Sequence, residues 1–273
     1  MANRPANNNG RWVRRALLAF VFVAPFLGFF LVRVNLFAAL APIFLSHALL
    51  LYGMLVPNCQ WLGPVARSFE TNEPEVWLTI DDGPSPAHTA ALLDLLDRFQ
   101  ARATFFVIGK NAEQYPHLLT EILTRGHAIA NHTYSHPSGS FWIAGPGRIA
   151  SEIGRCAELL RSTPERPPIF FRAPAGLKNV FVHPELDQRG LKLIGWTVRG
   201  LDTIRRDPSK VAERIVRNIK PGAIVLLHEG QRTEKDPQFN PQCLELTLTG
   251  LTEKGFRCVL PGPEQLRQCA AGK

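Results

Sequence analysis

The sequence predicts an α/β fold in which parallel strands, covered by helices, close into a barrel, preceded by one or two transmembrane helices. From residue 76 onward, short apolar runs alternate with segments of helical periodicity. Strands that are apolar on both faces belong to parallel sheets enclosed by helices. Seven such runs favour a closed or nearly closed seven-stranded barrel, with an open doubly wound sheet as the alternative. A chain of 273 residues has room for this domain and an appendage.

The first 57 residues have the composition of a membrane segment. The run 16–32 contains no polar side chain, and the run 36–56 contains only Ser46, His47 and Tyr52. A spanning helix needs roughly 20 apolar residues, so we expect one helix on each side of a turn at 33–35. A cleaved signal peptide is disfavoured, because the apolar stretch runs far beyond a signal core. The expected division is a disordered basic arm at 1–15, the membrane segment at 16–57, a linker at 58–75 and a globular domain at 76–273.

Charge and cysteine content argue against two classes of site. The chain has 31 basic and 23 acidic residues, but five basic residues and no acid precede residue 58, which leaves 26 against 23 in the rest. This near balance, without a basic stripe, argues against nucleic acid as a partner. The five cysteines are scattered and odd in number, with no CxxC pair. A disulfide framework or a cysteine-based zinc site is therefore not expected.

Seven runs are expected as strands, and three helix starts can be placed. The strand runs are 76–80, 103–108, 127–131, 169–172, 191–198, 223–228 and 256–259. Ser85 is expected to cap a helix that begins at Pro86, while Pro146 and Pro208 open two further helices. Proline is tolerated at a first helical position, because its missing N–H would have no partner there.

Polar side chains follow the expected strands at their carboxyl ends. They are Asp81 and Asp82 after the first, His132 and His136 after the third, Arg172 at the end of the fourth, Asp202 after the fifth and His228 at the end of the sixth. In barrels of parallel strands, reactive groups gather at the carboxyl ends. We therefore expect these residues to meet on one face.

Two of these pairs indicate a metal centre. His132 and His136 are four residues apart and can bring both imidazoles to one ion, which a carboxylate would complete into a three-ligand set with open positions. Asp81 and Asp82 are neighbours that point in different directions, so one can bind the ion while the other stays free. Taken alone, the histidines are typical of ordinary surface or core positions and the acids of a turn. Their combination at strand ends favours the metal.

Five motifs resemble those of the polysaccharide deacetylase family, also called the NodB-homology family or carbohydrate esterase family 4. They are Thr79-Ile80-Asp81-Asp82-Gly83-Pro84, His132-Thr133-Tyr134-Ser135-His136, Arg172-Ala173-Pro174, the stretch from Gly195-Trp196 to Asp202, and Leu226-Leu227-His228. The first two are specific, and the other three gain weight because all five occur in the family's order. The resemblance implies a NodB-like barrel and a hydrolase that removes an N-acyl group from an amino sugar.

The resemblance also implies a role for each matching residue. Asp82, His132 and His136 would bind one divalent cation, with zinc expected first and cobalt, nickel, manganese or iron as alternatives. Asp81 would be the general base toward the attacking water. His228 would be the general acid that protonates the leaving amine. Histidine suits that task because its pKa lies in the useful range.

Three supporting residues follow from the same resemblance. Arg172 and Asp202 would pair with each other and orient the base, and the backbone N–H of Ala175 would stabilise the oxyanion. The family usually has an aromatic residue where Ala175 stands, and an Asp and a Trp where Arg199 and Thr203 stand. These departures favour a substrate other than a plain polysaccharide chain.

Four residues are expected to contact the substrate. Phe141 and Trp142 lie in a Gly/Ser-rich loop after the second motif, where they would cover a sugar face or dip into lipid. Trp196 and Leu226 lie within the fourth and fifth motifs. Ordinary anchoring of the loop is the alternative for the first two, because single exposed aromatic side chains are common.

The leading hypothesis is therefore a membrane-anchored deacetylase or deformylase acting on an amino sugar of a lipid carrier or a cell-envelope glycan. One alternative is a non-catalytic carbohydrate-binding module of the same fold, and another is a redox iron protein with two histidines and one carboxylate. Asp81 and His228 favour hydrolysis over both, since neither alternative needs them.

The arrangement in the membrane bears on the substrate. Three arginines precede the first apolar run, at positions 11, 14 and 15. The positive-inside rule places such a segment in the cytoplasm, and two crossings return the chain to that side. We then expect a polyprenyl-linked amino sugar at the inner membrane of a bacterium. With a single crossing the domain would face outward, and peptidoglycan or a surface polysaccharide would be favoured.

Overall fold

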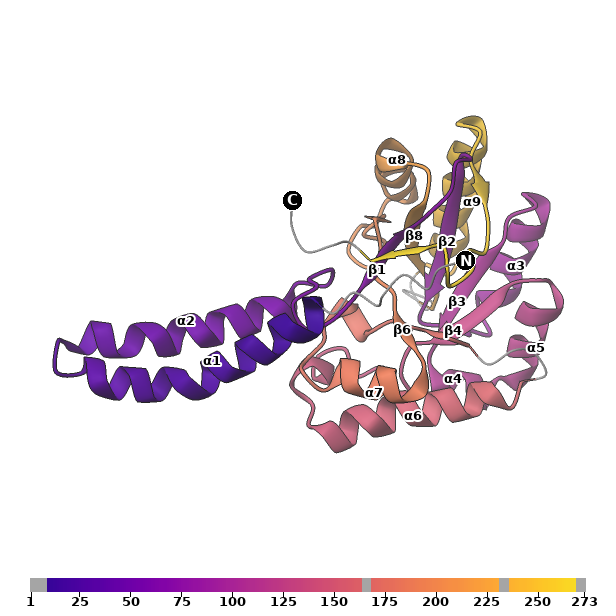
Figure 1. Cartoon of the computed structure of the whole chain (residues 1–273). Coiled ribbons are helices and arrows are strands. Elements are labelled where there is room, and N and C mark those ends of the chain that lie inside the picture. Colours follow the sequence, from indigo (N-terminus) through magenta and orange to yellow (C-terminus); the bar gives the residue numbers. More distant parts are fainter. Residues whose placement is uncertain (1–8, 164–167, 231–235, 269–273) are drawn as a thin grey trace.

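The computed structural model describes residues 9–163, 168–230 and 236–268, and it consists of a helical hairpin that projects from an α/β domain (Figure 1). The helices are α1 (Asn9–Leu31), α2 (Leu36–Leu55), α3 (Thr89–Arg98), α4 (Gly109–Gln114), α5 (Pro116–Thr124), α6 (Pro146–Arg161), α7 (Val182–Arg189), α8 (Pro208–Asn218) and α9 (Phe239–Glu253), with short 3-10 turns η1 (Phe141–Ile143) and η2 (Pro174–Gly176). The strands are β1 (Ala66–Phe69), β2 (Glu75–Asp81), β3 (Ala103–Val107), β4 (Ala128–Asn131), β5 (Phe170–Phe171), β6 (Lys192–Leu193), β7 (Val198–Arg199), β8 (Ala223–His228), β9 (Arg257–Cys258) and β10 (Leu266–Gln268).

The strands form one curved sheet in the order β10-β1-β8-β2-β3-β4-β5-β6. From β8 to β6 every pairing along this path is parallel. The chain runs directly from β6 into β7, which pairs in parallel with β8. The strands therefore enclose an interior, and the predicted α/β barrel class is confirmed.

Residues of β2 alternate between this interior and the surrounding helices. Leu78 and Ile80 share a core cluster with residues of α3 and α9. Trp77, which lies beside Leu78 in the chain, packs in a second cluster with Phe106 of β3. Because successive strand side chains face opposite ways, Asp81 at the end of β2 faces the interior with Trp77.

All seven expected strand ranges contain strand residues, but two details differ. The range 191–198 is divided into β6 and β7, because between them the N–H of Gly195 bonds to the carbonyl of Ala66 in β1 instead (2.8 Å). β1 itself lies within the expected linker 58–75, where it pairs with β8 and β10. The sheet thus begins before the boundary expected at residue 76.

Two of the three predicted helix starts are confirmed. α6 begins at Pro146 and α8 at Pro208, with Asp207 as a side-chain cap. The start predicted at Ser85 is wrong, because α3 begins at Thr89. The Thr89 Oγ1 accepts the N–H of Ser85 (2.8 Å), so the intervening residues form a turn rather than the first helical turn.

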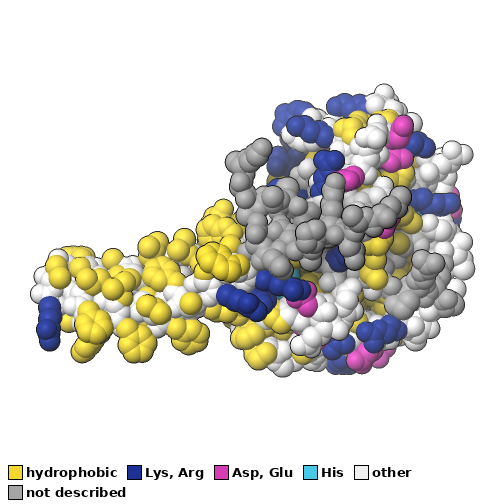
Figure 2. All heavy atoms as spheres, in the orientation of Figure 1, with side chains coloured by type: hydrophobic (Ala, Val, Ile, Leu, Met, Phe, Trp, Pro, Cys, Tyr) yellow, Lys and Arg dark blue, Asp and Glu magenta, His cyan; other side chains and the backbone are white. Residues whose placement is uncertain are grey.

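The hairpin consists of α1 and α2, both long and apolar enough to cross a membrane by length and composition. They lie side by side and carry a nearly continuous apolar surface (Figures 1 and 2). Phe22, Phe26 and Phe37 are each more than two-thirds exposed. The Asn35 side chain caps α2 by accepting the N–H of Ala38 (2.8 Å). Residues 9–15 of the expected disordered arm are helical, since α1 begins at Asn9; residues 1–8 lie outside the described residues.

The end of α2 is bonded to the α/β domain. Lys178 is fully buried, and its Nζ donates to the carbonyls of Val56 (3.0 Å) and Pro57 (2.8 Å). The Asn58 Nδ2 donates to the carbonyl of Trp196 (2.9 Å). The residues after α2 therefore pack directly against the segment after η2, which contains Lys178, and the segment before β7, which contains Trp196.

Candidate active site

The carboxyl ends of the parallel strands surround a cavity of about 380 Å³. It is lined by Asp81, Asp82, His132, His136, Ser138, Ala175, Gly176, Trp196, Arg199, Leu201, Asp202, Thr203, Ile204, Leu226 and His228. The structure thus brings the residues expected at four of the five strand ends to one place. Arg172, from the remaining strand end, is buried in the barrel interior beneath the cavity.

Asp82, His132 and His136 present three ligand atoms to one point. The Asp82 Oδ1 lies 3.4 Å from the His132 Nε2 and 3.2 Å from the His136 Nε2. The ligand atoms all lie within 4.8 Å of one another. Among the described residues, these three form the group of His, Cys, Asp and Glu side chains that could hold a metal ion. Two imidazoles and one carboxylate are a donor set for a divalent transition metal that leaves positions open. The residues present therefore fit the cation that the sequence predicts.

A backbone carbonyl fixes the orientation of His132. The His132 Nδ1 lies 2.8 Å from the carbonyl oxygen of Arg172. Since a carbonyl only accepts, Nδ1 donates to it, which leaves Nε2 to face Asp82 and His136. Outer hydrogen bonds of this type orient metal-binding histidines.

Burial and mutual charge set the protonation of two ligands. Burial alone would raise the pKa of the Asp82 carboxyl, but the hydrogen bond and charge of His132 hold that pKa well below its usual range. Burial, aided by the charge of His132, lowers the pKa of His136 to about 4. At neutral pH Asp82 is ionised and His136 is neutral, which are the forms that bind a cation.

Asp81 pairs with Arg172 in the barrel interior. The Arg172 Nη1 lies 2.5 Å from the Asp81 Oδ1 and 2.9 Å from the Thr79 Oγ1. Its guanidinium stacks over the ring of Phe106 at 4.1 Å. The predicted pair between Arg172 and Asp202 is therefore wrong. Arg172 points into the interior, where Asp81 also points, and contacts Asp81 directly.

Asp202 holds His228 instead. Its Oδ1 lies 3.0 Å from the His228 Nδ1, and its Oδ2 accepts the His228 backbone N–H at 2.7 Å. Burial lowers the pKa of His228, but the charge and hydrogen bond of Asp202, with the charges of Asp81 and Asp82, outweigh it and raise the pKa to about 9. His228 is therefore protonated at neutral pH and can donate a proton into the cavity.

Left-handed backbone conformations gather at this site. Six non-glycine residues of the described chain have positive φ, and five of them belong to the site: Asp82 (76°), Thr133 (69°), His136 (52°), Ala175 (53°) and Leu201 (65°). Such conformations are uncommon outside glycine and cluster at functional sites. Four of the five line the cavity, and Thr133 lies between His132 and His136 in the chain.

Comparison with known proteins agrees with this geometry. The sequence profile of the family described as polysaccharide deacetylase matches residues 69–194. The chitooligosaccharide deacetylase of Sinorhizobium fredii is 32% identical over 204 residues, which cover 72% of this chain and 94% of that protein. The chain belongs to the polysaccharide deacetylase family.

Other members of this family agree in sequence and in fold. A peptidoglycan-N-acetylglucosamine deacetylase of Bacillus cereus is 31% identical over 199 residues, covering 72% of this chain and 91% of that one. A solved peptidoglycan N-acetylglucosamine deacetylase superposes with a TM-score of 0.65 and 29% identity, over 71% of this chain and 89% of that one. The predicted family, barrel fold and enzyme class, a hydrolase of non-peptide carbon–nitrogen bonds in amino sugars, are confirmed.

The loop of this deacetylase after His136 corrects one predicted substrate contact. Phe141 is fully buried and packs near Phe171, with ring centroids 6.3 Å apart. The prediction that Phe141 reaches substrate is therefore wrong, because the ring anchors the loop in the core. Trp142 is half-buried and outside the cavity lining, whereas Trp196 and Leu226 line it.

Four lining residues of the deacetylase are not singled out by the motifs. They are Ser138, Gly176, Leu201 and Ile204. Ser138 and Gly176 each lie two residues after the second and third motifs, so their nearness in sequence is a signal for them. Leu201 lies within the fourth motif and Ile204 two residues after it, but neither side chain has a recognised role in the motif.

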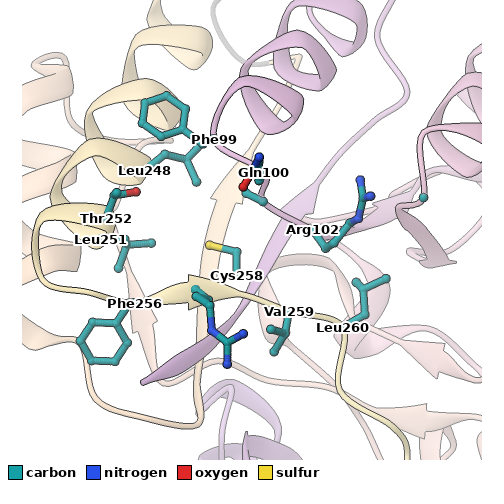
Figure 3. A pocket seen from close by; sticks show the side chains of 13 residues that line it. Phe99, Gln100, Arg102, Leu248, Leu251, Thr252, Phe256, Cys258, Val259 and Leu260 are labelled. Atoms are coloured by element: carbon teal, nitrogen blue, oxygen red, sulfur yellow. The ribbon is translucent and has the colours of Figure 1, made fainter. Parts of the chain in front are cut away.

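A second and larger hollow of about 490 Å³ lies at the opposite end of the strands. Its lining includes Phe99, Leu248 and Phe256 (Figure 3). Arg102, just before β3, and Cys258, in β9, also line it. The hollow contains no acid and base facing each other. The deacetylase chemistry is therefore assigned to the smaller cavity at the carboxyl ends.

Proposed function

We propose that the chain is a metal-dependent deacylase that removes an acetyl or formyl group from an amino sugar on a polyprenyl carrier at the inner face of a bacterial membrane. The observation that carries the proposal is that Asp81, Asp82 and a protonated His228 line the same cavity as His132 and His136. A binding module would need neither Asp81 nor His228.

The side chains divide the reaction between them. Asp81, held by Arg172, accepts a proton from the water that attacks the amide carbonyl. Ala175 offers its backbone N–H to the carbonyl oxygen as negative charge develops there. His228, held by Asp202, gives its proton to the amine nitrogen as the carbon–nitrogen bond breaks. The products are a free amino sugar and a carboxylic acid.

One divalent cation would be held by Asp82, His132 and His136. When bound, it would supply Lewis acidity toward the carbonyl and toward water. Two imidazoles and one carboxylate suit zinc first, and cobalt, nickel, manganese and iron accept the same donors.

The lipid carrier is proposed from the position of the cavity. Gly176 in the cavity wall contacts Pro57 at the end of α2, and Trp196 in the same wall is bonded to Asn58. A substrate that shares the membrane with the enzyme would present its sugar close to this wall. The departures at Ala175, Arg199 and Thr203 also favour a substrate other than a plain polysaccharide chain.

The test is product analysis with the full chain in detergent or nanodiscs. The panel consists of free and polyprenyl-linked amino sugars, each as N-acetyl and N-formyl form. We expect release of acid from the lipid-linked members at least tenfold faster than from the free sugars. Preference for free oligosaccharides would refute the lipid carrier, and absence of any release by the metal-loaded protein would refute the deacylase.

The metal assignment has its own test. His136→Ala should lower bound metal, measured by mass spectrometry of the dialysed protein, together with turnover. His47→Ala in α2, far from the cavity, is the matched control and should change neither. Full metal content in His136→Ala would place the cation elsewhere.

A further inference from the structure

Among the described residues of the α/β domain, a few large apolar side chains are exposed, and two of them share one place. They are Ile143 (63% exposed) and Phe181 (40% exposed). The Asn179 Nδ2 donates to the carbonyl of Ala144 (2.8 Å), and the Asn179 Oδ1 accepts the N–H of Phe181 (3.0 Å). One side chain thus ties the two loops together, and Ile143 with Phe181 is called the apolar rim below.

The apolar rim is held firmly rather than carried on a loose loop. Phe141 and Ala144, on either side of Ile143, are buried in the core. Asn179 and Val182, on either side of Phe181, are also buried. Exposing large apolar side chains to water on such rigid supports is unfavourable, so a partner that covers them would be stabilised in place.

The rim adjoins the hairpin. Lys178, three residues before Phe181, donates from Nζ to the carbonyls of Val56 and Pro57 and from its backbone N–H to the carbonyl of Met54 (3.2 Å). In Figure 1 the start of α6 and the loops near it extend toward the side from which α1 and α2 project. Figure 2 shows apolar side chains on this part of the domain, beside the base of the hairpin.

Exposed basic side chains lie at the start of α1 and in the first turn of α6. They are Arg11 and Arg15 in α1 and Arg148 in α6. The Arg11 Nη2 pairs with Asp187 of α7 (2.9 Å), which brings the start of α1 beside the domain. Arginines beside an apolar surface match anionic headgroups above an acyl layer.

We propose that the apolar rim inserts into the headgroup layer of the bilayer that the hairpin crosses, so that the α/β domain rests on the membrane in one fixed orientation. The occupant is lipid, because the segment that carries Phe181 is bonded to the end of the apolar helix α2, and Arg148 lies exposed in the helix that follows Ile143. This rests on the membrane part of the proposed function. It adds that the wall formed by Gly176 and Trp196 stands next to the headgroups, where the sugar of a lipid-linked substrate lies.

The test measures depth in the membrane rather than activity. Single cysteines are introduced in the full chain as Ile143→Cys and Phe181→Cys, spin-labelled and reconstituted in nanodiscs with anionic lipid. Leu246→Cys and Leu260→Cys are matched controls, because these side chains are 40% and 39% exposed and lie elsewhere on the domain. Phe26→Cys in α1 reports insertion of the hairpin, and the unmutated chain gives the labelling background.

The readout is the ratio of relaxation by oxygen, which concentrates in lipid, to relaxation by a water-soluble nickel chelate. We expect the ratio at positions 143 and 181 to exceed that at 246 and 260 at least threefold and to approach that at 26. Equal ratios at all four domain positions, with position 26 in lipid, would overturn the docking of the rim. A water-like ratio at position 26 would overturn the membrane part of the proposed function instead.

Discussion

At the scale of single residues, the barrel interior is organised around a buried cation. The guanidinium of Arg172 is fully buried and donates to the carbonyls of Ile194 (3.3 Å) and Gly195 (3.0 Å) as well as to Thr79 and Asp81. Burial lowers the pKa of Arg172, while Asp81 opposes this. A buried charge is tolerated only when it is paired and fully hydrogen-bonded. Asp81 and these other acceptors therefore satisfy the buried guanidinium of Arg172 beneath Asp82, His132 and His136.

Asp81→Asn should retain the metal but lose most turnover. The three ligands are unchanged, whereas the group that accepts the proton is gone, and such groups contribute about a hundred- to ten-thousandfold. Metal content and kcat of the same preparation check this. Asp187→Asn is the control, because Asp187 forms only an exposed pair with Arg11. A normal rate in metal-loaded Asp81→Asn would exclude Asp81 as the base.

Asp202→Asn should move the alkaline limb of the rate profile to lower pH. His228 acts in its protonated form, and its raised pKa of about 9 keeps that form present at neutral pH. The rate should therefore fall as the pH rises through the pKa of His228, and removing the charge of Asp202 lowers that pKa. A bound cation lowers the pKa in both proteins, so the comparison between them carries the test. The measurement is kcat/KM against pH with saturating metal, and coincident limbs would exclude Asp202 as the group that tunes His228.

At the scale of elements, the sequence predicts those features that are determined by residues close together in the chain, such as side-chain alternation and helix starts. The alternation along β2 implied that Asp81 and Asp82 point different ways, and Pro146 and Pro208 open their helices as expected. The partners of Asp202 and Arg172 depend instead on which strands are neighbours. β2 pairs with β8, so that Asp81 stands opposite His228. No local sequence pattern encodes this pairing, so the contacts Asp202–His228 and Arg172–Asp81 were not predicted.

One other departure has the same origin. Phe141 lies in a Gly/Ser-rich loop without periodicity, so no pattern in the sequence indicates that its ring faces the core. Burial of Glu229, directly after His228, has no sequence signal either: the side chain is fully buried, and burial raises its pKa to about 8. Its Oε2 accepts a hydrogen bond from the Thr89 hydroxyl (2.7 Å). Its carboxylate also occupies the space that a side chain at position 83 would need, so that only glycine fits there. Glu229 thus packs against the turn that follows β2, a contact between residues far apart in the sequence.

Lys178→Met should weaken the junction between α2 and the α/β domain. The substitution removes the two hydrogen bonds that the buried Nζ donates to the carbonyls of Val56 and Pro57, and a hydrogen bond to a charged group contributes about 1.5–3 kcal/mol. Denaturant unfolding of the full chain in detergent measures the loss. Lys192→Met is the matched control, because its Nζ donates to the single carbonyl of Pro263 (2.9 Å). Equal effects of the two substitutions would contradict a special role for Lys178.

At the scale of the whole molecule, the antiparallel hairpin determines which parts share one side of the membrane. The ion pair between Arg11 and Asp187 places the start of α1 beside the α/β domain, and α2 returns to the same base. The turn at Arg33 lies at the opposite end of the hairpin. Two helices that each cross the membrane therefore leave the amino-terminal arginines and the catalytic cavity on one side.

The charges at the two ends of the hairpin predict which side that is. Four arginines, at positions 4, 11, 14 and 15, lie at or before the start of the first apolar run, against Arg33 alone at the turn. Because basic flanks stay in the cytoplasm, we expect the cavity to face the cytoplasm, where lipid-linked sugars are accessible. An export-requiring phosphatase fused after residue 273 should be inactive, and the same reporter fused after Asn35 should be active. Activity of the fusion after residue 273 would instead place the cavity outside the cytoplasm. Peptidoglycan or a surface polysaccharide would then be the expected substrate.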